Sequence, residues 1–253
     1  MIKKYKVIRE DGTFLIYLMR YKGAETYSFI NMTKGHICPC VFNSIKEAEE
    51  DFKNYKNIIK VVEQEVVLGV DRMLIDSILV ENPFGVFQEE GLSEFIEDNL
   101  RGMDRDIAEE DISFKQIIPY LVVKFENKYL LYKRTKKVSE SRLREKLSIG
   151  IGGHINPIDD VQGSIIAEAL RRQLSEEIKL KISQERRAVG FINDDQNEVG
   201  KVHLGVVFTV EADDLEFEVL EKENIVAEWA TKEQLKTEFD RLESWSQLVL
   251  DIV

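Results

Sequence analysis

The pattern of hydrophobic and polar positions along residues 114–253 predicts strands that alternate with helices. Apolar runs typical of strands lie at 117–125, 128–133, 148–155, 188–193, 203–210 and 225–230. Apolar residues at helical spacing lie within 164–180, 231–238 and 244–252. Because helices on both sides of a mixed sheet bury its two faces, the pattern predicts an α/β/α sandwich.

The pattern in the first 62 residues predicts a small α+β unit. Its role is not predicted. Strands are predicted at 5–9, 13–21 and 26–32, and a helix is predicted over 44–59, where Ser44 and Glu47 form a capping box. Residues 63–113 predict a bridge that contains a strand, two short helices and a charged loop. We therefore divide the chain into residues 1–62 and a domain of residues 63–253 that includes the bridge.

Composition narrows the function classes. The chain has 253 residues, of which 43% are hydrophobic, so a substantial core is expected. Its net charge of −12 argues against binding a nucleic-acid duplex, whose phosphates it would repel, but a divalent cation can reverse the local charge for a small phosphorylated ligand. The sequence contains no signal peptide and no apolar run of membrane length, so we expect a cytoplasmic protein without a membrane partner.

The two cysteines, Cys38 and Cys40, are too few for a disulfide framework. In a strand they would share one face with His36, which suits either a ligand cluster or a packed interior. We favour the interior, because a zinc site usually needs four ligands.

The helix predicted over 164–180 carries polar residues with a chemical meaning. Gln173, Glu176 and Glu177 share one helical face through their i, i+3, i+4 spacing. Adjacent acidic oxygens are ligands that Mg²⁺ prefers, and Mg²⁺ suits a phosphate substrate. The alternative is a solvated face on which Arg172 is the surface partner of these glutamates.

The segment 148–180 resembles the Nudix box of the Nudix hydrolases. Gly153 matches the leading glycine of the box, Arg172 its arginine, Leu174 its aliphatic position, and Glu176 and Glu177 its glutamate pair. A wider similarity, over about residues 66–253, to a MutT-like subgroup of predicted phosphoesterases rests on the stretches 114–123, 130–134 and 148–157. The resemblance implies the Nudix α/β/α sandwich.

The chain departs from the box at several positions. The loop after Gly153 is about five residues longer than in the pattern, Ser164 replaces its first glutamate, and Lys179 replaces its late glycine. Gln173 replaces the glutamate after the arginine, which keeps a carbonyl oxygen but removes a negative charge, so the site should bind Mg²⁺ more loosely. Asp159 and Asp160, in the long loop, are candidates for replacement oxygens, but we favour the alternative, a loop-closing turn.

The resemblance implies a hydrolase, dependent on Mg²⁺ or Mn²⁺, that cleaves a pyrophosphate bond in a nucleoside-diphosphate-linked small molecule. Glu176 and Glu177, with Gln173, would hold the metal, and Arg172 would fix the glutamates. Water would attack phosphorus with the help of a carboxylate base, for which Glu198 is our candidate. Homodimers are usual in the resembled family.

Substrate binding is expected from the residues around the glycine pair. The backbone at Gly152 and Gly153 permits close approach, and His154 follows at the end of the strand. Arg134 and Arg144 belong to a local basic cluster that suits substrate phosphates. The alternatives are a structural hydrogen bond for His154 and a charge-balancing exposed loop for the arginines.

A second function stays open, from a different class. Gln173 and Ser164 favour a catalytically weak Nudix module that binds a nucleotide or phosphorylated metabolite without turning it over. The N-terminal unit is a candidate interaction or dimerisation module. Substrate identity is not predicted.

Overall fold

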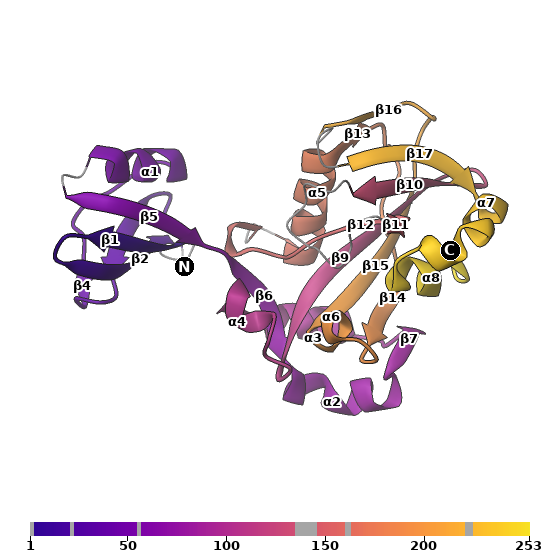
Figure 1. Cartoon of the computed structure of the whole chain (residues 1–253), viewed down its shortest axis with the longest axis horizontal. Helices are drawn as coiled ribbons and strands as arrows, with labels where there is room; N and C mark the ends of the chain where they lie inside the picture. The colour runs from indigo at the N-terminus through magenta and orange to yellow at the C-terminus, as the bar shows by residue number, and fades with distance from the viewer. Residues whose placement is uncertain (1–2, 21–22, 55–56, 135–145, 160–162, 221–224) are drawn as a thin grey trace.

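The computed structural model describes the chain except for residues 1–2, 21–22, 55–56, 135–145, 160–162 and 221–224. Figure 1 shows a small N-terminal unit beside a larger α/β unit, with the chain passing from β5 of the first into β6 of the second. Among the described residues, no helix is long and apolar enough to cross a membrane.

The N-terminal unit is a five-stranded antiparallel sheet in the order β4-β3-β2-β1-β5, with one helix packed on it. Its elements are β1 (Lys3–Arg9), β2 (Gly12–Arg20), β3 (Tyr27–Asn31), β4 (His36–Ile37), α1 (Ile45–Asn54) and β5 (Ile58–Gln64). Alternate side chains, among them Val7 and Leu18, form its own hydrophobic cluster.

One expectation for this unit, the extent of its helix, was wrong. The helix predicted over 44–59 begins as expected, since Ser44 accepts a hydrogen bond from the Glu47 amide at 3.1 Å, but it ends at Asn54. Ile58–Gln64 instead forms β5 along β1, because its β-branched residues suit a strand and β1 offers an open edge. Cys38 and Cys40 are joined by a disulfide, so their thiols are not available as metal ligands.

The larger unit is built on a ten-stranded mixed sheet whose main path runs β11-β10-β9-β15-β14-β7. The pair β9 and β15 is parallel and the other pairs in this sheet are antiparallel. Its strands are β6 (Val66–Asp71), β7 (Phe84–Phe87), β8 (Arg101–Asp104), β9 (Phe114–Phe125), β10 (Lys128–Arg134), β11 (Leu147–Ser148), β12 (Gly150–Gly152), β14 (Arg187–Asp194), β15 (His203–Glu211) and β17 (Ile225–Thr231). The short strands β13 (Ile178–Leu180) and β16 (Phe217–Val219) form a separate pair.

Helices cover both faces of this sheet, so the predicted α/β/α sandwich is confirmed (Figure 1). Along β9 the side chains alternate: Leu121 packs with Leu170 of α5, while Val122 belongs to the cluster that contains Leu235 of α7 and Val249 of α8. The helices are α2 (Arg72–Glu81), α3 (Leu92–Asp98), α4 (Arg105–Ala108), α5 (Ile165–Glu177), α6 (Glu198–Lys201), α7 (Lys232–Thr237) and α8 (Ser244–Leu250).

The segment predicted as a bridge is an integral part of the sandwich. Strands β6, β7 and β8 extend the large sheet, and Ile75 of α2 and Ile96 of α3 share a core cluster with Ile166 of α5. The charged segment that was predicted as a loop forms α4 instead, and Glu109 follows its last turn.

Candidate functional site

A cavity of about 630 Å³ brings most of the predicted site residues together. Helix α5 forms one side of it, and α5 packs against β9 and β12 (Figure 1). The predicted residues in its lining are Gly152, Gly153, His154, Arg172, Gln173, Glu176 and Glu177. Residues from the glycine strand and from helix α5, which are distant in sequence, therefore line the same cavity.

The start of α5 explains the serine that replaces the first glutamate of the box. Ser164 is the N-cap of the helix, and its hydroxyl accepts a hydrogen bond from the Ala167 amide at 3.1 Å. The same hydroxyl donates to the carboxylate of Glu97 on α3. Ser164 thus begins the helix and ties it to α3.

Arg172 connects a box glutamate to the loop after the glycine strand. Its guanidinium donates to Glu176 Oε2 at 3.2 Å, and to the His154 carbonyl and Asn156 Oδ1 at 3.1 Å each. Asn156 in turn donates to the Val66 carbonyl at 3.0 Å. The arginine therefore fixes the helix face and the loop relative to each other.

Gln173 is buried and only half satisfied. Its Nε2 donates to the His154 carbonyl at 2.9 Å, while its Oε1 has no hydrogen-bond partner among the described residues. The amide group packs on Gly153, where an added Cβ would lie 3.0 Å from Nε2 and 3.1 Å from Cδ. Gly153 therefore leaves room for the glutamine.

Gly152 has a packing role as well. A Cβ at this position would lie 2.8 Å from the carbonyl oxygen of Pro119 on β9, which is closer than real Cβ contacts. The glycine thus permits β12 to pair tightly with β9 below the cavity.

Two histidines and a glutamate meet in the cavity, a cluster that the sequence analysis missed. His154 Nε2 lies 3.4 Å from His203 Nε2 and 3.9 Å from Glu109 Oε1. Burial lowers the pKa of His203, and burial with the nearby Arg105 cation lowers that of His154 well below its usual value, so both imidazoles are neutral near pH 7. His203 stood out only as the start of a strand, and Glu109 lay in a segment predicted to be a loop.

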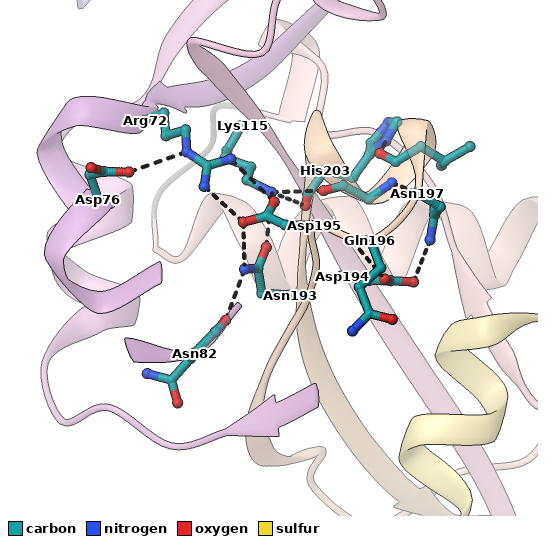
Figure 2. Close-up of polar contacts among 12 residues, drawn as sticks. Arg72, Asp76, Asn82, Lys115, Asn193, Asp194, Asp195, Gln196, Asn197 and His203 are labelled. Carbon is teal, nitrogen blue, oxygen red and sulfur yellow. Dashed lines mark hydrogen bonds and ion pairs between the residues drawn. The ribbon is translucent and has the colours of Figure 1, made fainter. Parts of the chain in front are cut away.

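The His203 backbone rests on a buried lysine. Lys115 is fully buried, and its ammonium donates to Asn193 Oδ1 at 2.9 Å, Asp195 Oδ1 at 2.7 Å, the Gly200 carbonyl at 2.7 Å and the His203 carbonyl at 3.2 Å. Figure 2 shows Asn193 at the end of β14, Asp195 just after it and His203 at the start of β15 around this ammonium. The lysine therefore holds in place the backbone that carries His203.

The surroundings of this ion pair lower the pKa values of both Lys115 and Asp195, for different reasons. Burial lowers the pKa of Lys115 to about 8, because desolvation of the ammonium outweighs its attraction to Asp195. Burial also opposes the charge of Asp195, but hydrogen bonds from Arg72, Lys115 and Asn193 outweigh it and lower the pKa of Asp195 to about 2. Arg72 binds both oxygens of this carboxylate, at 3.1 and 2.7 Å.

Another part of the lining combines a held carboxylate with aromatic rings. Glu243 Oε1 accepts hydrogen bonds from Ser148 at 2.6 Å, Tyr120 at 2.8 Å and Ser246 at 3.1 Å. The Trp245 ring packs edge-on against Tyr120, with centroids 5.6 Å apart, and both rings line the cavity.

The remaining predicted residues are not brought into this arrangement. The side chain of Glu198 is 79% exposed, pairs with Lys201 at 2.6 Å and is not part of the cavity lining. Arg144 and Asp160 lie outside the described residues, as do the side chains of Arg134 and Asp159. Lys146, from the same basic segment as Arg144, does line the cavity.

Comparison with known proteins places this geometry in a family. No family model matches the chain. Protein YmaB of Bacillus subtilis is 43% identical over 167 residues, which cover 62% of this chain and 80% of YmaB. The crystal structure of Tm1382, assigned to the Nudix hydrolases, superposes with a TM-score of 0.61 and 28% identity over 74% of this chain and 97% of that one. Together with the box residues that line the cavity, this similarity shows that the chain belongs to the Nudix hydrolase superfamily.

Proposed function

We propose that the protein hydrolyses a pyrophosphate bond in a nucleoside-diphosphate-linked small molecule, with Mg²⁺ or Mn²⁺ as cofactor. The observation that carries the proposal is the convergence of Arg172, Glu176 and Glu177 on one cavity of about 630 Å³, which suits a nucleotide-sized ligand.

The oxygen donors on α5 fit a hard divalent cation. Glu176 and Glu177 contribute carboxylates to the cavity, and the buried Gln173 Oε1 lacks a hydrogen-bond partner among the described residues. A cation of this kind takes oxygen ligands, so we propose that these three side chains hold it. Such a metal, when bound, would polarise phosphoryl oxygens and neutralise charge that develops on them.

The remaining lining suits the other parts of such a substrate. Lys146 brings an ammonium group to the cavity, where it donates to the Asp240 carbonyl at 3.1 Å, and it can move to a phosphate oxygen. Trp245 and Tyr120 offer apolar ring surface for a base or another planar group. Arg172 orients Glu176 through its hydrogen bond. The general base is not assigned, because Glu198 does not line the cavity.

The test is release of phosphate or nucleotide from nucleoside di- and triphosphates, dinucleotides, ADP-ribose and nucleotide sugars, with Mg²⁺ or Mn²⁺. We expect the double variant Glu176→Gln/Glu177→Gln to lose roughly 100-fold or more of the activity, since it removes charge at the reacting phosphate. The matched control is Glu89→Gln/Glu90→Gln, an exposed adjacent pair that should keep full activity. Equal activity in both double variants would contradict the proposed site.

A binding module is the second candidate. Gln173 lacks the charge of the usual glutamate and commits its amide to a backbone carbonyl, and Ser164 serves as a helix cap. If no compound is hydrolysed while one of them raises the thermal midpoint of the protein, the binding module replaces the hydrolase.

A further inference from the structure

The cluster of Glu109, His154 and His203 has the geometry of a metal site. The nearest ligand atoms of the three side chains all lie within 4.8 Å of one another, with the two Nε2 atoms 3.4 Å apart. Ligand atoms about 2.1 Å from a tetrahedral ion lie about 3.4 Å from each other. An ion therefore fits between the imidazoles with small movements of the glutamate.

We propose that Glu109, His154 and His203 bind a divalent transition metal ion, with Zn²⁺ as the fitting example, beside the carboxylates of α5. Two imidazole nitrogens and one carboxylate are a typical ligand set for such ions and leave a position open, whereas Mg²⁺ prefers oxygen alone. The open position would face the cavity, where water or a substrate phosphate oxygen can enter. The inference does not depend on the proposed hydrolysis.

The hydrogen bonds around the cluster prepare His203 for this role. Its Nδ1 lies 2.7 Å from the Val199 carbonyl, an acceptor, so Nδ1 carries the proton and Nε2 presents a lone pair to the cluster. This backbone partner is the kind of outer contact that orients histidine ligands in metal sites. The buried ammonium of Lys115 also holds the His203 carbonyl, and Figure 2 shows this link to the Asp195 network.

His154 is fixed by the box itself. Its carbonyl accepts hydrogen bonds from Arg172 at 3.1 Å and from Gln173 at 2.9 Å, so helix α5 holds the backbone that carries the imidazole. Without metal, the two rings share one hydrogen bond, with Nε2–H of His154 donating to Nε2 of His203. For the two histidines, metal binding requires that His154 move its proton to Nδ1, which keeps the ring neutral.

The experiment is titration of the metal-stripped full chain with Zn²⁺ by calorimetry, and with Co²⁺ by visible absorption, without reductant so that the Cys38–Cys40 disulfide persists. We expect about one tightly bound Zn²⁺ per chain, and a Co²⁺ spectrum typical of mixed nitrogen and oxygen ligands. Excess Mg²⁺ should not displace either ion.

Three variants test the ligands: His154→Gln, His203→Gln and Glu109→Gln. Each should weaken Zn²⁺ binding by at least about 10- to 100-fold. The matched controls are His36→Gln, at the remaining histidine, which is exposed on β4, and Glu110→Gln, at the exposed neighbour of Glu109; both should bind as the parent does.

Other results would overturn the proposal. The parent chain could bind no Zn²⁺, or the three ligand variants could bind it as tightly as the parent does. Zn²⁺ binding could also be lost in Glu176→Gln/Glu177→Gln but not in the three ligand variants. If a histidine variant does not fold, Zn²⁺ binding by Glu109→Gln and the Co²⁺ spectrum of the parent still test whether these side chains bind the metal. Because these readouts need no substrate, they can fail or succeed independently of the hydrolase assay.

Discussion

At the scale of single residues, Gln173 stands where the Nudix pattern has a glutamate, and its Nε2 donates to the His154 carbonyl. In Gln173→Glu a carboxylate oxygen would face that carbonyl inside a buried site. We expect the variant to lose about 1–3 kcal/mol of stability in metal-free buffer, because the donor is lost and a charge is buried. Mg²⁺ should then raise the thermal midpoint of the variant more than that of the parent, since it compensates the added charge.

The control for this substitution is Gln184→Glu, the same chemical change at an exposed position. It should leave both the stability and the Mg²⁺ response close to those of the parent. A Gln173→Glu protein as stable as the parent, with the same response to Mg²⁺, would show that Mg²⁺ binds away from this side chain.

Asp195 is the residue on which the Lys115 network depends. Asp195→Asn leaves the fully buried ammonium of Lys115 without its anionic partner, although three oxygen acceptors remain. We expect a loss of about 2–3 kcal/mol in urea unfolding, below the 3–5 kcal/mol typical of a broken buried pair. Asp76→Asn, at the 53% exposed partner of Arg72, should cost less than about 0.5 kcal/mol. Equal losses in the two variants would contradict this ranking.

The same carboxylate predicts a pH dependence. Its pKa is lowered in the folded state from 3.8 to about 2, so the folded protein binds this proton less readily than the unfolded chain. The stabilisation, about 2 kcal/mol, is therefore present above roughly pH 4 and is lost as the pH falls through 2. Urea unfolding over this range should show the difference between the parent and Asp195→Asn shrinking as the pH falls. A constant difference would be inconsistent with the low pKa.

At the scale of elements, the N-cap of α5 sets where the helix that carries Arg172, Gln173, Glu176 and Glu177 begins. Ser164→Ala removes the hydrogen bond to the Ala167 amide and the contact with Glu97, so we expect a loss of about 1 kcal/mol in thermal or urea unfolding. Ser175→Ala, on the exposed side of the same helix, is the control and should change stability by less than about 0.5 kcal/mol. If the two substitutions cost the same, Ser164 is not the cap that the geometry indicates.

The elements themselves were predictable where local pattern and tertiary environment agree. The apolar stripe of Ile166, Leu170 and Leu174 identifies α5, and the long apolar run at 117–125 identifies β9. Prediction failed where the partner was distant in sequence. Strand β5 exists because it pairs with β1, and Ile178 leaves the helix because β13 pairs with β16. The local sequence favours a strand at 58–64 through its β-branched residues, but it does not identify the distant partner that the strand pairs with.

The candidate site was predictable to a similar extent. The one-helix spacing of Arg172, Gln173 and Glu176 is a local pattern, and the structure places all three in the cavity lining. Glu109 and His203 join it from segments far apart in the chain, so only the folded sheet brings them to His154. The sequence of the long loop between Gly153 and α5 does not indicate which of its carboxylates lie near the helix.

At the scale of the whole molecule, the N-terminal sheet has a hydrophobic cluster of its own, which among the described residues shares no member with the four clusters of the larger unit. Polar contacts link the units, including an ion pair between Lys4 and Asp104. Because each unit buries a separate core, we expect calorimetry to resolve two unfolding transitions rather than one.

Matched core substitutions can assign these transitions. Leu18 and Leu121 are both fully buried, the first in the N-terminal cluster and the second beneath α5. Each change to alanine should cost about 2–5 kcal/mol within its own unit. Leu18→Ala should therefore lower one transition temperature, and Leu121→Ala the other, while the second transition stays in place in each case. A single transition that moves with either substitution would mean that the interface around Lys4 couples the two units into one cooperative structure, and that the N-terminal sheet stabilises the Nudix fold directly.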